Sequence, residues 1–140
     1  MATPGFSAIG GGTQYKDRNM KRLVPPLCLA FLLAAGPALA ETRCGWIQNP
    51  TPGNWWLTDA QGEWTIGTQG GAQAEGMDLL PDFTAGEWVV TNGSSYGYGC
   101  ACLEVTTERG NGQTITAIMD VDQLPLKRCT ADSALPSPNN

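Results

Sequence analysis

The feature that most constrains this chain is an export signal at residues 20–40. Met20-Lys21-Arg22 supplies a short basic start, the run from Leu23 to Leu33 is mostly apolar, and small residues lead to Ala38-Leu39-Ala40. The export machinery needs this order of basic anchor, short apolar stretch and small side chains at the cleavage site. We therefore expect residues 20–40 to be a signal peptide, and the mature protein to begin at Glu41 in a periplasmic or secreted location.

Residues 1–19 precede this signal, although a signal normally begins the chain. They are rich in glycine and polar side chains and show no apolar period. We expect them to be an over-extended start or a disordered extension that takes no part in the fold. Cys28 lies inside the apolar stretch and is removed with it. Because that stretch is too short for a comfortable membrane span, we expect no membrane anchor after cleavage.

Removal of residues 1–40 makes the protein strongly acidic. The whole chain has a formal net charge of −5, whereas residues 41–140 keep twelve acidic and four basic side chains, a net charge of −8. Proteins that bind nucleic acid neutralise phosphates with clustered Lys and Arg, so this composition argues against a nucleic-acid partner. It is compatible with a basic protein partner steered by long-range attraction, although solubility alone also explains it.

Four cysteines remain after cleavage: Cys44, Cys100, Cys102 and Cys129. An even number in an exported chain predicts two disulfides. Cys100 and Cys102 are too close in sequence to bridge each other with suitable geometry. Two connectivities stay open: Cys44–Cys100 with Cys102–Cys129, or Cys44–Cys102 with Cys100–Cys129. Zinc binding is the rival interpretation, but the spacing is not that of a zinc finger and the chain has no histidine, so we expect no metal or cofactor.

The rest of the pattern predicts an all-β or mostly β fold. Short runs of strand-forming residues are separated by Gly, Pro and Asn, which is typical of hairpins. We expect a small disulfide-stapled antiparallel sheet or partly open barrel built of hairpins. It should form a single globular domain over residues 41–130, followed by a flexible tail over residues 131–140.

The turn residues also predict where the strands lie. The expected strands cover residues 43–48, 55–58, 63–67, 87–91, 98–107 and 114–121. We expect strand 55–58 to form a hairpin with 63–67, and strand 98–107 to form a hairpin with 114–121. Residues 49–54 contain two prolines and a glycine and are expected to form a rigid loop outside the sheet. Met77–Leu80 offers at most one helical turn.

Alternation in the last hairpin predicts which of its residues face the core. The expected core positions are Ala101, Leu103, Val105, Ile115, Ala117, Met119 and Val121. Cys100 and Cys102 then point to the other face. The two disulfides would therefore tie both ends of the domain across the back of this hairpin.

Aromatic side chains are the most suggestive feature for function. Trp55 and Trp56 are adjacent, so on a strand they point to opposite faces, and one of them must be exposed or covered by a loop. An exposed tryptophan beside a rigid loop offers a large contact area and an N–H donor, as sugar and protein binding sites do. The simpler alternative is that Trp46, Trp64 and Trp88 fill the core and loops cover the others. The candidate binding residues are Asn54, Trp55, Trp56, Tyr96 and Tyr98.

No catalytic residue is predicted. The absence of histidine excludes Ser/His/Asp and Cys/His nucleophilic schemes in their usual forms. The nearest carboxylate pairs for glycoside hydrolysis are Asp59 with Glu63 and Asp120 with Asp122, and the second pair is also a weak calcium pattern. In an acidic domain such pairs usually form a solvated surface, so we expect a protein that is not an enzyme.

Several motifs together resemble a known family. They are Arg43-Cys44-Gly45-Trp46, residues 49–57, Gly62-Glu63-Trp64 and residues 96–102. This combination is similar to DUF4087, a family of short exported bacterial proteins of unknown function. The resemblance covers nearly all of residues 41–140, including Pro125-Leu126 and Cys129. It implies bacterial origin and export, and it offers no catalytic residue to carry over.

Three functional hypotheses follow from these observations. The first is a non-catalytic binding domain that recognises a protein, such as a basic envelope protein, in the manner of an inhibitor or immunity protein. The second is a glycan or cell-wall binding module that uses Trp55, Trp56 and Tyr98 as stacking platforms. The third and least favoured is a carboxylate-dependent hydrolase.

Overall fold

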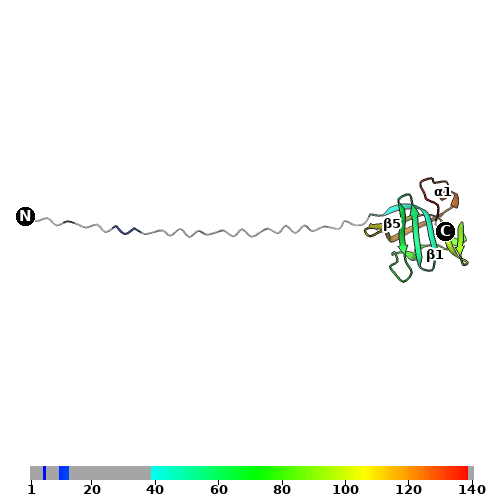
Figure 1. Cartoon of the computed structure of the whole chain (residues 1–140), viewed down its shortest axis with the longest axis horizontal. Helices are drawn as coiled ribbons and strands as arrows, with labels where there is room; N and C mark the ends of the chain where they lie inside the picture. Colours follow the sequence, from blue (N-terminus) through cyan, green and yellow to red (C-terminus); the bar gives the residue numbers. More distant parts are fainter. Residues whose placement is uncertain (1–4, 6–9, 13–38, 139–140) are drawn as a thin grey trace, which may run out of the picture. The chain divides into compact units, whose positions relative to one another are not determined.

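The structure is a computed structural model that describes residues 5, 10–12 and 39–138 (Figure 1). Most of the predicted extension at 1–19 and of the predicted signal at 20–40 lies outside these residues. The elements are β1 (Glu41–Thr51), β2 (Asn54–Asp59), β3 (Gly62–Gly67), η1 (Met77–Leu79), η2 (Phe83–Ala85), β4 (Trp88–Asn92), β5 (Tyr96–Arg109), β6 (Gln113–Leu124) and α1 (Leu126–Thr130). The fold is therefore mostly β, as predicted. No helix within the described residues is long and apolar enough to cross a membrane.

Five of the strands form a ring. They follow the order β1-β2-β3-β6-β5, and the ring closes because β5 also pairs with β1. Figure 1 shows β1 and β5 side by side. β4 pairs with the start of β5, outside the ring. A partly open barrel was predicted and is present, but the sheet is mixed and not wholly antiparallel, because β3 and β6 run parallel.

The junction between β3 and β6 is the least complete part of the ring. A single registered pair, Thr65 with Thr114, joins the two strands. Beyond it the segment 73–75 fills the gap: Ala74 N donates to the Ile66 carbonyl at 2.8 Å, and Glu75 N donates to the Thr116 carbonyl at 2.9 Å. The glycine-containing segment after β3 therefore completes the ring where the two strands diverge.

Both predicted hairpins are present, and their core positions are largely as expected. Ala101, Leu103 and Val105 on β5 are fully buried. On β6 the register with β5 shifts twice, between Glu104 and Val105 and between Thr106 and Thr107. Each shift adds an unpaired residue and changes the phase of the alternation. Ile118 is therefore buried in place of Met119, which is 44% exposed, so the prediction for Met119 was wrong.

β1 extends further than its predicted range. Residues 49–51 were expected in a loop, but they continue the strand, and only Pro52 and Gly53 separate β1 from β2. Pro50 is tolerated because it lies at a register shift between Gln48 and Thr51 and is paired with no residue on either side. A proline lacks the N–H of a ladder hydrogen bond, so such irregular positions accept it.

The two predicted disulfides are present, and the structure decides their connectivity. Cys44 bridges Cys102, its direct neighbour across β1 and β5, with a Cα–Cα distance of 4.0 Å. Cys100 bridges Cys129 on α1 with a Cα–Cα distance of 5.8 Å. The expected arrangement is thus found, because both bridges hold an end of the domain to the outer face of β5.

The segment 131–138 lies within the expected flexible tail, and the structure places it against the outside of the barrel. A second apolar cluster forms beneath it, centred on Trp46, Cys100 and Cys129, with Leu124, Leu126 and Leu135 packed around them. This cluster is separate from the main core inside the ring.

Candidate functional site

The strongest candidate site is a set of aromatic and amide side chains on the outer face of β1, β2 and β5. Ile47 and Leu57 point into the ring and are fully buried. Since side chains alternate along a strand, Trp46, Gln48 and Trp56 project from the outer side. With Tyr98 of β5 they form what we call the outer aromatic face: Trp46, Gln48, Trp56 and Tyr98.

The strand register places three of these residues in one row. Gln48 pairs with Trp56 on β2 and with Tyr98 on β5. Directly opposed residues have Cβ atoms about 5 Å apart, so the two aromatic side chains flank the glutamine. Gln48 is buried, and its Nε2 donates to Thr58 Oγ1 at 2.8 Å. The two rings are half-buried, so each keeps a surface that a ligand can reach.

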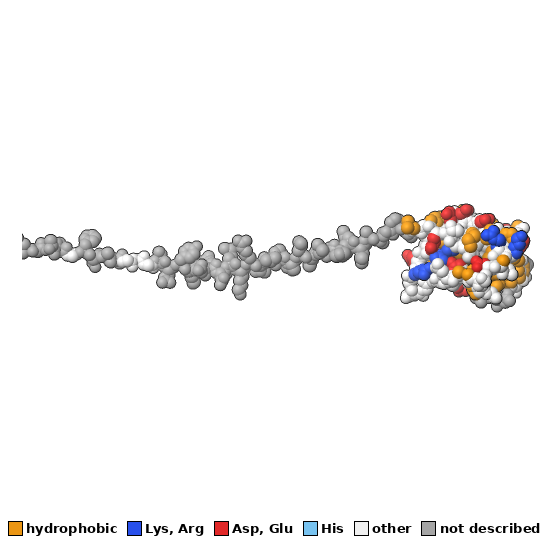
Figure 2. All heavy atoms as spheres, turned by 90° about the horizontal axis from the view of Figure 1, so that it is seen from above, with side chains coloured by type: hydrophobic (Ala, Val, Ile, Leu, Met, Phe, Trp, Pro, Cys, Tyr) orange, Lys and Arg blue, Asp and Glu red, His pale blue; other side chains and the backbone are white. Residues whose placement is uncertain are grey.

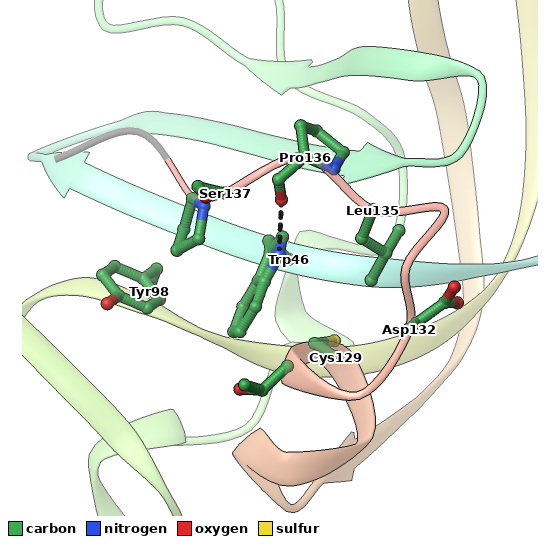
Figure 3. Close-up of a pocket in the computed structure, with 9 residues that line it drawn as sticks. Trp46, Tyr98, Cys129, Asp132, Leu135, Pro136 and Ser137 are labelled. Carbon is green, nitrogen blue, oxygen red and sulfur yellow. Dashed lines mark hydrogen bonds between the residues drawn. The ribbon is translucent and has the colours of Figure 1, made fainter.

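Trp46 adds a groove beside this row. Its ring meets that of Tyr98 edge-on, with the centroids 5.6 Å apart. The indole Nε1 donates to the carbonyl oxygen of Pro136 at 3.0 Å. Figure 3 shows the segment 131–138 crossing over the edge of this indole, with Leu135 to one side and Ser137 to the other. A cavity of about 230 Å³ remains between the segment and the two rings.

The candidate binding residues predicted from sequence do not all lie on this face. Trp56 and Tyr98 do. Trp55 packs instead against the main core, where its ring lies 5.9 Å from that of Phe83, which in turn stacks on Trp88 at 5.4 Å. The expectation that adjacent tryptophans take opposite sides is met, and Trp55 is the inward one.

The other two candidates are Asn54, at the start of β2, and Tyr96, at the start of β5. The amide of Asn54 is engaged on both sides: Nδ2 donates to Thr51 Oγ1 at 2.6 Å, and Oδ1 accepts from the backbone N–H of Gln69 at 2.8 Å. Tyr96 is half-buried at the start of β5, paired with Asn92 of β4. Asn54 thus ties the segment after β3 to the turn between β1 and β2.

The carboxylates named as the nearest candidates for glycoside hydrolysis lie on β2, β3 and β6. Asp59 is buried and Glu63 is exposed. Asp120 and Asp122 are both exposed on β6, where they lie opposite Glu104 and Cys102 of β5. Within residues 39–138 no group of three or more metal-ligating side chains is placed to hold an ion.

A buried charged cluster at one end of the ring was missed by the sequence analysis. Arg43 Nη1 lies 2.5 Å from Asp59 Oδ2, and the guanidinium carbon of Arg43 lies 3.6 Å from the ring centroid of Trp64. Asp59 Oδ1 accepts from Trp64 Nε1 at 3.1 Å. At the rim, a hydrogen bond from the Thr107 hydroxyl lowers the pKa of the Glu41 carboxyl below 4.5, and the positive charge of Arg43 lowers it further against the effect of desolvation. Among the described residues, no buried side-chain polar atom is left without a hydrogen-bond partner.

A second cavity lies at the β3–β6 junction. It has a volume of about 380 Å³ and includes the threonines at positions 65, 68, 114 and 116 in its lining, with Glu108 on β5. Thr65 pairs with Trp56 across β2 and β3, so this cavity adjoins the outer aromatic face. The cavity therefore presents hydroxyl groups close to the ring of Trp56.

Acidic side chains are spread over the domain. Figure 2 shows them dispersed over the visible face of the domain and not gathered into one patch. Of the four basic side chains in residues 41–140, Arg43 is buried and Arg109 lies over Trp64. Lys127 and Arg128 are both on α1. The accessible surface therefore carries a diffuse negative potential.

The sequence did not predict that Trp46, Gln48 and the segment 131–138 belong to a site. The alternation of Trp46 and Gln48 around the apolar Ile47 is a signal that the first two face outward. Nothing in the local sequence indicates that Pro136 covers Trp46, because the two residues lie ninety positions apart.

Comparison with known proteins assigns the chain to a family without assigning an activity. No curated protein and no solved structure matches the chain. Residues 38–136 match the family described as "Protein of unknown function (DUF4087)". This match covers the whole ring, α1 and most of the segment over Trp46. The chain therefore belongs to the DUF4087 family of proteins of unknown function.

Proposed function

We propose that this protein is a non-catalytic, protein-binding domain of the bacterial envelope or the extracellular space. The observation that carries this proposal is the outer aromatic face, where Trp56 and Tyr98 flank a buried amide and keep accessible ring surface. Half-buried Trp and Tyr side chains on a rigid sheet lose little entropy on binding, and they are the residue types enriched at the centres of protein interfaces.

The charge of the domain suggests which kind of protein would bind. Residues 41–140 carry a net charge of −8, and the accessible carboxylates are spread over the surface. Such a surface attracts a basic partner and speeds its association at low ionic strength. A basic envelope protein, bound in the manner of an inhibitor or immunity protein, fits this chemistry. The two disulfides are consistent with an oxidising compartment, which agrees with the predicted export.

The test is capture of partners on immobilised, oxidised protein, followed by washes of increasing salt. The wild type and Leu79→Ala should retain the same protein, because Leu79 is exposed on η1 and is not part of the outer aromatic face. Trp56→Ala should lose it. The captured protein should be basic and should be released as salt rises, because screening weakens attraction between exposed charges. Equal capture by wild type and Trp56→Ala would contradict the proposal.

A second candidate, glycan binding, is favoured by one observation. The threonine-lined cavity at the β3–β6 junction adjoins Trp56. If the ligand is a wall glycan, insoluble cell wall should retain the wild type through the salt washes, since stacking and neutral hydrogen bonds are little affected by salt. Trp56→Ala and Thr65→Ala should then both be lost in the flow-through. A hydrolase would instead release soluble sugar from the wall, and Asp120→Asn would abolish that release while binding persists.

A further inference from the structure

The segment that crosses Trp46 has the character of a bound peptide. Residues 136–138 form neither helix nor strand. Within the described residues, one hydrogen bond joins positions 133–138 to the barrel, the bond from Trp46 Nε1 to the Pro136 carbonyl. Leu135 also packs in the second apolar cluster, which is centred on Trp46, Cys100 and Cys129. Because one hydrogen bond and the packing of Leu135 hold the segment, a competing ligand can displace it.

The sequence of this segment matches a common ligand chemistry. Leu135-Pro136-Ser137-Pro138 has two prolines separated by one residue. Proline-containing segments favour the extended polyproline II conformation, in which the backbone carbonyls project outward without internal hydrogen bonds. Proteins that recognise such segments use grooves lined with aromatic side chains, and the peptide arrives with little conformational entropy left to lose. Trp46 and Tyr98, set edge to face, form a groove of this kind, with an indole N–H bonded to a peptide carbonyl.

The groove is only partly filled by this segment. About 230 Å³ remains between it and the two aromatic rings (Figure 3). Asp132 is among the residues that line this cavity, and its Oδ1 accepts from the backbone N–H of Ala134 at 2.9 Å. A ligand that filled the space with further proline or apolar side chains and placed a Lys or Arg near Asp132 would make contacts that the chain's own segment does not.

We propose that the Trp46–Tyr98 groove binds an extended, proline-containing segment of a partner protein, and that residues 135–138 occupy it as an intramolecular ligand. The inference rests on the proposed function and names the ligand class for one part of the outer aromatic face. The partner segment displaces residues 135–138, whereas α1 stays in place because Cys129 is bonded to Cys100. The segment belongs to the same chain, so its effective concentration at the groove is high. A weak ligand therefore does not displace it.

The proposal is tested with the full-length oxidised protein and an opened variant that combines Leu135→Ser, Pro136→Gly and Pro138→Gly. These changes lie outside the ring, and intact mass and circular dichroism verify both disulfides and the fold. The probe is a fluorescent synthetic peptide with the sequence of residues 133–138. The opened variant should bind it at least about tenfold more tightly than the wild type does, because the competing segment no longer occupies the groove.

Two further substitutions, each added to the opened variant, test whether the peptide binds in the Trp46–Tyr98 groove. Trp46→Phe keeps an aromatic ring and removes the N–H donor, so the peptide should bind about fivefold more weakly, as expected for one lost hydrogen bond. Trp88→Phe is the matched control, because its indole N–H donates to Ser95 on the other side of β5 from β1, and it should leave the affinity unchanged. Equal weakening by both changes would overturn the assignment to the groove.

A folded opened variant that does not bind the peptide would overturn the inference. This failure is distinct from failure of the proposed function. If the wild type captures a protein through Trp56 but the opened variant does not bind the proline peptide, the proposed function is supported and the proline ligand is wrong. If the opened variant binds the peptide but no Trp56-dependent partner is captured, the groove stands and the proposed partner is wrong.

Discussion

Arg43 and Asp59 form a buried ion pair inside one end of the barrel, with Nη1 and Oδ2 2.5 Å apart. Both side chains are more than nine-tenths buried, and the second carboxylate oxygen accepts hydrogen bonds from the Trp64 indole and from the backbone N–H of Gln61. The pair thus connects β1 to the β2–β3 hairpin. Because each charge is satisfied by the other, loss of one partner leaves an uncompensated buried charge.

We expect Asp59→Asn to lower the free energy of unfolding by about 3–5 kcal/mol, the usual effect of removing one partner of a buried pair. Urea unfolding followed by tryptophan fluorescence measures it. Glu63→Gln is the matched control, because Glu63 is exposed on the neighbouring strand, and it should stay within about 0.5 kcal/mol of the wild type. Equal stability of the two variants would show that the pair does not stabilise the barrel.

Glu41 predicts a dependence of stability on acid pH. The folded pKa of its carboxyl is lowered, mainly by the hydrogen bond from Thr107 and secondarily by Arg43, relative to the 4.5 of the free group. The folded protein therefore binds fewer protons at this site than the unfolded chain does, so this contribution is complete above about 4.5 and is lost as the pH falls through the folded pKa. The free energies of unfolding of the wild type and of Glu41→Gln should therefore converge as the pH is lowered from above 4.5. A difference between them that stays constant with pH would argue against the linkage.

The two disulfides should differ in how readily they are reduced. Cys44 is exposed and Cys102 is half-buried, whereas Cys100 and Cys129 are both buried. Thiol exchange requires a thiolate to reach a sulfur atom, so a mild reductant should open Cys44–Cys102 first. Alkylation followed by peptide mass mapping identifies the cysteines released at each stage. Labelling of Cys129 before Cys44 would contradict this order.

Removal of each disulfide should also have a distinct structural effect. The bridges close loops with sequence separations of 58 and 29 residues, and on the chain-entropy estimate each contributes about 3–4 kcal/mol. Replacement of Cys44 and Cys102 by alanine should leave α1 protected from hydrogen exchange. Replacement of Cys100 and Cys129 should expose residues 126–138 to exchange, because this bridge attaches α1 to β5.

Gly45 is a position where the barrel tolerates no side chain. A Cβ atom there would overlap the carbonyl oxygen of Thr58 on the adjacent strand, and a backbone carbonyl cannot move aside without breaking the ladder. Gly45→Ala should therefore cost about 3 kcal/mol, the upper end of the usual range for overpacking. Gly110→Ala is the control, since a Cβ at Gly110 meets no atom within 4 Å. The midpoint temperature of thermal unfolding should be lower for Gly45→Ala than for Gly110→Ala. Similar midpoints would refute the steric explanation.

Much of the local structure followed from the sequence. The turn residues between 59 and 62 and between 109 and 113 predicted the two hairpins, and alternation predicted the inward positions of Ala101, Leu103 and Val105. These features depend on interactions between residues close in the chain, so a short window of sequence contains the necessary information. The even number of cysteines and their spacing likewise predicted two bridges on the back of the last hairpin.

Other features depended on register. Met119 was expected in the core, but two bulges on β6 turn it outward, and no local pattern marks those bulges. The same limit applies to the adjacent tryptophans: their opposite orientation could be predicted, but only the pairing of β1 with β2 and β5 shows that Trp56 joins Gln48 and Tyr98 on the outer face.

Residue pattern and composition were sufficient to predict the mostly β class, the two hairpins, the two disulfides and the acidic charge of the domain. Only the folded domain shows the pairing of Cys44 with Cys102, the closure of the ring and the position of Pro136 over Trp46. The physical reason is the sequence separation of the contacts. Pairing of β1 with β5, and covering of β1 by residues ninety positions later, bring distant segments together, and such contacts are selected by packing of the whole domain and not by local propensity.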